Sequence, residues 1–249
     1  MAGELQDSQG RGTVHRGLPR IHPDGRRFGL AALGLAGLFG LLAWETLAWP
    51  LAFLSLCIFA FFRDPERVVP QESDAILSPA DGVIVDIGMA PPPAELVIDD
   101  GGDAPALPRD EVVRVGIAIS LFDVHINRTP IAGVIRRVVY VPPSFAGFDA
   151  ARGRGEQERQ HILIEHGEAM RVGLTQIAGT FARRIVAFVK PGDILGAGQR
   201  VGLIRFGSRV DLYLPPSTGC RVILGQRVVA GETVIANSGD QPIREGVTH

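Results

Sequence analysis

The chain has 249 residues, enough for one large or two small domains, and its 46% hydrophobic and 21% charged residues exclude a disordered protein. Its net charge of −2 gives no general attraction to nucleic acid, so we expect no nucleic-acid partner. Lys190 is the only lysine, and the two cysteines, Cys57 and Cys220, are isolated, which argues against a disulfide and against a metal site.

The N-terminal part divides into a polar tail, residues 1–27, and an apolar stretch, residues 28–62. Glu45 and Pro50 interrupt the apolar stretch, so it predicts a membrane-associated helical hairpin and not one straight spanning helix, which needs about 20 apolar residues. Arginines on both sides favour two cytoplasmic ends. Small residues share one face of the first arm and would let the arms pack closely: Ala32, Ala36 and Gly40. A buried helical pair in a soluble core is the alternative.

Residues 63–249 are rich in short β patterns. Val112–Ile119 and Gly133–Val141 consist mostly of β-branched residues and are expected strands. In the segment 123–127 polar residues alternate with apolar ones, so Asp123, His125 and Asn127 are expected on one strand face.

A weak repeat follows, in which Gly198-Gln-Arg-Val201 recurs as Gly225-Gln-Arg-Val228. Hairpin turns of this kind are typical of small β-sandwiches. We therefore expect a mainly β (α+β) fold, a lipoyl-like or barrel-sandwich domain preceded by the membrane-associated hairpin.

The segment Phe206-Gly-Ser-Arg209 joins two expected strands. One interpretation is a β-bulge or tight turn, since glycine adopts backbone angles that other residues avoid. The other is a self-cleavage site, where the Ser208 hydroxyl attacks the carbonyl of Gly207. The dipeptide by itself leaves both open.

Four motifs occur in order: Phe61-Phe-Arg-Asp-Pro-Glu-Arg67, Ser78-Pro-Ala-Asp-Gly82, Phe122-Asp-Val-His-Ile-Asn-Arg128 and Phe206-Gly-Ser-Arg209. Together they resemble phosphatidylserine decarboxylases of the short bacterial and archaeal form, over about residues 21–237. The resemblance implies a zymogen that cleaves itself between Gly207 and Ser208 and stays together as a heterodimer of a β chain, 1–207, and an α chain, 208–249.

The same resemblance implies that Ser208 becomes a covalent pyruvoyl group, the cofactor, and that Asp81 and His125 complete a Ser-His-Asp set with it. The longer bacterial form has a second histidine three residues before this one, where the present chain has Phe122. The donor of the proton in decarboxylation is therefore left open.

Chemistry agrees with this interpretation. A neutral His125 can take the Ser208 proton while Asp81 holds the tautomer, and the resulting ester can eliminate and hydrolyse to a pyruvoyl group and ammonia. The pyruvoyl carbonyl would form a Schiff base with phosphatidylserine, release CO2 and yield phosphatidylethanolamine. Pyridoxal chemistry would need a Schiff-base lysine, and Lys190 lies in a Lys-Pro-Gly turn, so a built-in carbonyl is the better explanation.

Because a two-chain phospholipid stays in the bilayer, the resemblance also implies an enzyme at the surface of the cell membrane, and the arginines flanking the apolar stretch favour the cytoplasmic side. Arginines are candidates to bind the lipid phosphate: Arg205 and Arg209 first, then Arg136 and Arg137. A higher homo-oligomer is left open. The alternative function is a non-catalytic membrane-anchored adaptor or carrier with a lipoyl-like β-sandwich.

Overall fold

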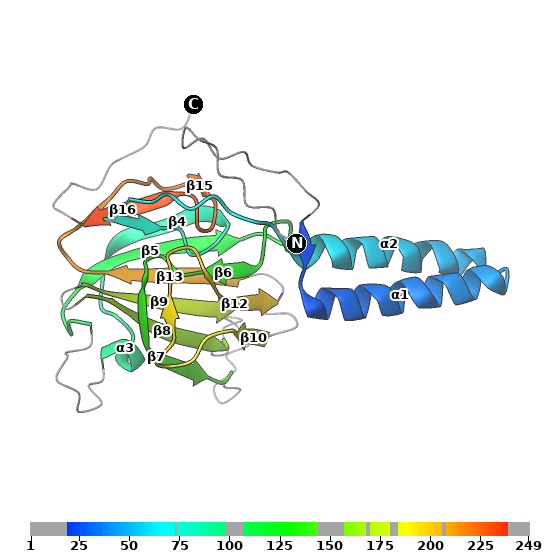
Figure 1. The fold of residues 1–249 in the computed structure, drawn as a ribbon, viewed down its shortest axis with the longest axis horizontal. Helices are drawn as coiled ribbons and strands as arrows, with labels where there is room; N and C mark the ends of the chain where they lie inside the picture. The colour runs from blue at the N-terminus through cyan, green and yellow to red at the C-terminus, as the bar shows by residue number, and fades with distance from the viewer. Residues whose placement is uncertain are drawn as a thin grey trace, which may run out of the picture. The chain divides into compact units, whose positions relative to one another are not determined.

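The computed structural model describes residues 19–72, 74–97, 107–143, 157–167, 170–179, 184–205 and 208–238, and of Ser208 it describes the backbone alone. Two compact units divide the chain, Met1–Glu66 and Arg67–His249. The first contains the helical hairpin, and the second contains the eight-stranded sheet and the two three-stranded sheets (Figure 1).

The first unit is a helical hairpin closed by a two-stranded sheet. Its elements are β1 (Arg20–Ile21), α1 (Pro23–Leu41), α2 (Glu45–Phe61) and β2 (Arg63–Asp64), with β1 antiparallel to β2. Helix α1 begins at Pro23, ahead of the expected start at residue 28. The His22 side chain accepts a hydrogen bond from the Asp24 amide, and proline at the first helical position has a backbone angle already suited to the helix.

Small residues let α1 and α2 approach closely. The buried residues of α1 are Gly25, Gly29, Ala32 and Ala36, whereas Gly40 is exposed. A Cβ added at Gly29 would lie 2.3 Å from the Phe59 ring, and the Ser55 hydroxyl donates a 2.8 Å hydrogen bond to the Gly29 carbonyl. The expected close packing is therefore confirmed, with glycines nearer the start of the helix in place of Gly40.

The outward surface of the hairpin is apolar. Large exposed side chains on the two helices and their connection include Phe28, Leu30, Leu33, Leu41, Trp44, Trp49, Phe53 and Leu56. Within the described residues, no helix combines the length and the hydropathy that crossing a membrane requires.

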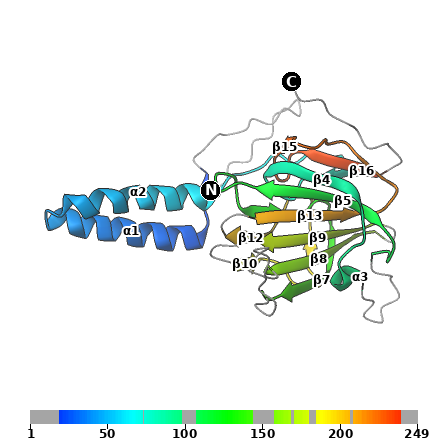
Figure 2. The same ribbon diagram turned by 180° about the vertical axis from the view of Figure 1, so that it is seen from behind.

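The second unit is mainly β, as expected, and its largest sheet curls into a half-barrel (Figure 2). This antiparallel sheet has the order β11 (Ile194–Leu195), β7 (Gly133–Val141), β8 (Arg159–His166), β9 (Met170–Ala178), β13 (Ser208–Leu214), β5 (Val112–Ile119), β4 (Gly82–Ala90) and β15 (Arg227–Val228).

Two three-stranded antiparallel sheets and a short helix, α3 (Ala94–Val97), complete the unit. One sheet has the order β10 (Arg184–Ala187), β12 (Arg200–Arg205) and β6 (Ile126–Arg128); the other has β14 (Thr218–Cys220), β16 (Val234–Ser238) and β3 (Ala75–Leu77). The expected likeness to lipoyl-type sandwiches stays a prediction.

Strand alternation separates the core from the outer surface. On β13, Val210, Leu212 and Leu214 lie in the main apolar core, whereas Arg209 and Asp211 alternate with them and form an ion pair. The two copies of the sequence repeat each begin at a glycine in the left-handed region, Gly198 with φ 74° and Gly225 with φ 81°.

Candidate functional site

The expected cleavage junction lies where β12 passes into β13. Ser208 is the first residue of β13, and its backbone pairs with Ile119 of β5 and with Ala178 of β9. Strand β13 lies inside the large sheet, between β9 and β5 (Figure 1). Phe206, Gly207 and the Ser208 side chain are outside the described residues.

His125 is fully buried immediately before β6. Its carbonyl accepts a 3.2 Å hydrogen bond from the Ile204 amide, so the ladder between β6 and β12 extends to His125. The ring Nδ1 lies 3.0 Å from the Asp123 carbonyl oxygen. Because a carbonyl only accepts hydrogen bonds, Nδ1 carries a proton, and in the neutral form of the ring Nε2 then holds the lone pair that a general base requires.

The contacts of Asn127 show that β6 packs against β9 of the large sheet. The Asn127 amide oxygen accepts a 2.7 Å hydrogen bond from Gln176 of β9, two residues from the Ala178 that pairs with Ser208. His125 is two residues before Asn127 along the extended ladder, so the two share a face.

Asp81 lies in the turn that opens β4, at the same end of the large sheet. Its carboxylate forms two hydrogen bonds with Arg67, of 2.7 and 3.0 Å, and accepts a third, of 2.8 Å, from the Ala230 amide. Both side chains of the ion pair are mostly buried, 12% and 13% exposed. The structure gives the Asp123 carbonyl as a partner of His125 Nδ1, and the tautomer role expected of Asp81 stays a prediction.

Comparison with known proteins decides the family. Residues 54–236 match the profile of the phosphatidylserine decarboxylase family. The chain belongs to this family. Similar proteins named phosphatidylserine decarboxylase proenzyme occur in Novosphingobium aromaticivorans, 55% identical over 99% of this chain and 98% of the relative, and in Erythrobacter litoralis, 52% identical over 99% of both. A third, from Zymomonas mobilis, is 48% identical over 90% of this chain and 89% of its own length.

Two of the arginines expected to bind the phosphate lie close to the junction. Arg209 follows it directly, but its guanidinium already contacts Asp211 and, at 3.0 Å, Asp86. Burial raises the pKa of Asp211, and the positive charge of Arg209 opposes that rise. Arg205 is half-buried at the end of β12.

The other two arginines lie on β7. Arg136 pairs with Glu165, and Arg137 donates a hydrogen bond to the Glu95 carbonyl. Phe122, in the position where the longer form of the phosphatidylserine decarboxylases has a histidine, is 82% exposed.

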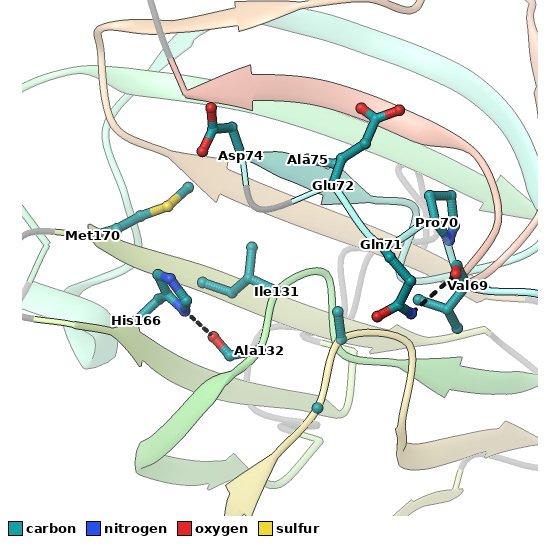
Figure 3. A pocket seen from close by; sticks show the side chains of 12 residues that line it. Val69, Pro70, Gln71, Glu72, Asp74, Ala75, Ile131, Ala132, His166 and Met170 are labelled. Carbon is teal, nitrogen blue, oxygen red and sulfur yellow. Dashed lines mark hydrogen bonds between the residues drawn. The ribbon is translucent and has the colours of Figure 1, made fainter.

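A cavity of about 400 Å³ lies elsewhere in the second unit. Figure 3 shows His166 and Met170 on one side of it and Val69, Pro70 and Gln71 on the other. The Nδ1 atom of His166 is 2.7 Å from the Ala132 carbonyl oxygen. None of the expected site residues is among those that line this cavity.

Two features of the site were not predicted from the sequence. Arg67 was considered only as the last residue of the first motif, yet it forms an ion pair with Asp81. Gln160 and Gln176 were not predicted as site residues, because the sequence around them shows only ordinary strand patterns. Gln176 meets Asn127 only because two sheets pack against each other. The motif containing His125 was the one signal that pointed to Asn127.

Proposed function

We propose that this chain is a proenzyme that converts phosphatidylserine to phosphatidylethanolamine and CO2 after cleaving itself between Gly207 and Ser208. Family membership supports the reaction class. The carrying observation is the strand register: Ser208 opens β13 opposite Ile119, and Asp81 directly precedes β4, whose Val83 lies opposite Ala118, so both belong to the same end of the large sheet.

In the proposed processing reaction, Nε2 of His125 takes the proton of the Ser208 hydroxyl while the oxygen attacks the Gly207 carbonyl carbon. The Asp123 carbonyl supports this step, because it keeps the proton of the neutral ring on Nδ1. Loss of the Ser208 α-proton then expels the Gly207 carboxylate, and hydrolysis of the remaining dehydroalanine gives the pyruvoyl group and ammonia.

The fold suits a pyruvoyl group at this position. Strand β13 is paired on both sides, with β5 along Ser208–Leu214 and with β9 from Ser208 to Tyr213, so a new chain end at Ser208 would remain anchored after cleavage. A pyruvoyl group supplies a carbonyl that draws electrons from a substrate amine as CO2 leaves. The chain's own contribution would be to position that group and to exclude water with the buried core beside Val210.

The proposal includes binding of the hairpin to the cytoplasmic face of the cell membrane. Exposed apolar side chains on α1 and α2 support this, since so large an apolar surface is unusual for a protein in water. Arg20 and Arg63 at the base of the hairpin suit anionic lipid headgroups.

Denaturing mass spectrometry of the purified protein tests the proposal. We expect two masses, one for residues 1–207 and one for residues 208–249 with a blocked N-terminus. Ser208→Ala should give one uncleaved mass and no release of CO2 from phosphatidylserine vesicles. An intact native chain, or normal cleavage of Ser208→Ala, would contradict the proposal.

A further inference from the structure

Two tight turns lie at the end of the large sheet where β13 begins. The first turn, residues 120–123, follows β5, whose last residue, Ile119, is opposite the backbone of Ser208. The second turn, residues 223–226, precedes β15, and its Gly225 amide donates a 2.8 Å hydrogen bond to the start of β4. Because β4 and β5 are antiparallel, the start of β4 and the end of β5 lie at the same end of the sheet.

Each turn is closed by two hydrogen bonds between its first and fourth residues. The Asp123 amide donates to the Ser120 carbonyl at 3.0 Å, and the Asp123 carboxylate accepts from the Ser120 amide at 2.9 Å. Gln226 makes the same two contacts with Ile223, at 3.2 and 3.1 Å. The Arg227 side chain also forms an ion pair with Asp123. The two turns are therefore ordered and tied to each other.

The middle positions of these turns hold large, exposed apolar side chains. Leu121 is 52% exposed, Phe122 82% and Leu224 60%. Turn positions in contact with water usually hold glycine, proline, asparagine, aspartate or serine, and Gly225 is the one middle residue of that kind. A group of exposed apolar side chains on ordered backbone is typical of a contact surface. We call these three side chains the apolar tip.

The exposed charges beside the apolar tip are positive. In segments 119–125 and 221–228, both within the described residues, the exposed charged residues are Arg221 and Arg227. The Arg227 side chain is 68% exposed, whereas its partner Asp123 is 2% exposed. Apolar side chains flanked by arginines complement an anionic phospholipid surface, which offers negative headgroups above an apolar interior.

We propose that the apolar tip enters an anionic phospholipid bilayer and holds the Ser208 end of the large sheet at the membrane surface. The inference rests on the proposed function, in which the substrate is a two-chain lipid that stays in the bilayer. Phe122 is three residues beyond Ile119, a chain length of at most about 11 Å, and Ile119 is opposite Ser208. A headgroup beside the apolar tip is therefore near the residue expected to carry the pyruvoyl group.

An environment-sensitive nitrobenzoxadiazole label on the full-length chain tests insertion. Cys57, the exposed cysteine, is first replaced by serine, and Leu224→Cys then provides the labelling site. Ile194→Cys is the matched control, because Ile194 is 80% exposed but lies on β11, at the opposite edge of the sheet from β15. With vesicles of phosphatidylcholine and phosphatidylserine, the label at position 224 should brighten and be quenched by brominated acyl chains, whereas the control label should not respond.

Three results would overturn the inference. The label at position 224 could fail to respond to the vesicles, or both labels could respond equally. It could also brighten without vesicles as the protein concentration rises, which would assign the apolar tip to a second copy of the chain. Insertion is measured independently of cleavage, so a native chain that inserts but does not cleave itself would refute the proposed function and not this contact.

Activity provides a second measurement on the processed protein. The double variant Leu121→Ser/Leu224→Ser should lower the ratio of decarboxylation on vesicles to decarboxylation of a monomeric short-chain phosphatidylserine by about tenfold or more. The reason is that burial of one leucine side chain shifts an equilibrium by at least about tenfold. Ile194→Ser should keep the native ratio. An unchanged ratio in the double variant would contradict the proposed contact.

Discussion

At the scale of single residues, a nearby backbone group orients the His125 ring for its proposed role. The Asp123 carbonyl, two residues earlier, holds the ring through Nδ1, and burial keeps the side chain in one place. The Asp81 carboxylate is held by Arg67 and by the Ala230 amide. In the proposed mechanism a backbone carbonyl therefore controls the tautomer, a task that hydrolase triads assign to a carboxylate.

Removing His125 should block maturation. We expect His125→Ala to slow cleavage of the proenzyme by at least about 10²-fold, the contribution typical of a general base. The fraction of the 208–249 fragment, followed by gel electrophoresis after a pulse of synthesis, measures this. His166→Ala is the control, since that exposed histidine contacts Ala132 and should leave cleavage unchanged. Efficient self-cleavage of His125→Ala would exclude His125 as the base.

Arg67 should matter for stability as well as for processing. In a Ser208→Ala background, Arg67→Gln leaves the mostly buried Asp81 carboxylate without its ion pair, and we expect a loss of about 3 kcal/mol in the free energy of unfolding, measured by urea denaturation. Arg136→Gln breaks a pair in which the arginine is 54% exposed and should change little. Equal effects of the two substitutions would show that Asp81 does not depend on Arg67.

At the scale of elements, the start of β4 is set by close contact with β5. A Cβ on Gly82 would lie 2.2 Å from the Ala118 carbonyl oxygen, whereas a Cβ on Gly88 of the same strand would meet no atom within 4 Å. This difference explains why the Ser-Pro-Ala-Asp-Gly segment ends in glycine, and it ties the position of Asp81 to the sheet.

Alanine substitutions at Gly82 and at Gly88 should therefore have opposite effects on the free energy of unfolding. Gly82→Ala should lower the free energy of unfolding by about 2 kcal/mol or more, because Ala118 is backbone and cannot move aside cheaply. Gly88→Ala should raise it by about 0.5 kcal/mol through lower unfolded-state entropy. Urea denaturation of both in the Ser208→Ala background is the measurement, and a similar cost at the two positions would contradict the contact.

At the scale of the whole molecule, the hairpin offers a direct optical test of membrane binding. Trp44 and Trp49 are the only tryptophans of the chain, and both are exposed on the hairpin. With intact protein, vesicles containing anionic phospholipid should shift tryptophan emission to shorter wavelength, and lipids brominated on their acyl chains should quench it.

The response should be weaker with phosphatidylcholine vesicles and should fall with salt, because arginines at the base of the hairpin attract anionic headgroups. Unchanged emission with anionic vesicles would show that the hairpin does not enter the lipid. That result would leave the proposed chemistry of Ser208 untouched.

The sequence by itself determined the features that depend on neighbours along the chain. Small residues four apart predicted a close helical pair, β-branched runs predicted strands such as β5, and the order of four motifs indicated the family. It also predicted one strand face for Asp123, His125 and Asn127; all three are buried, but only Asn127 lies on β6, and Asp123 lies in the bend before it. Each of these signals is local, since helix and strand periodicity act over a few residues.

Only the tertiary structure decided the partners of the polar side chains. Arg67 reaches Asp81, 14 residues away, and Gln176 reaches Asn127, 49 residues away, because strand register and the stacking of two sheets bring them together. The sequence indicated no partner for Arg67, since a pattern of charges does not state which opposite charge each residue will meet. Burial of the apolar side chains fixes the positions of the strands and therefore decides which polar groups meet. A charge or amide buried in this way needs a partner at that position, because leaving it unpaired costs free energy.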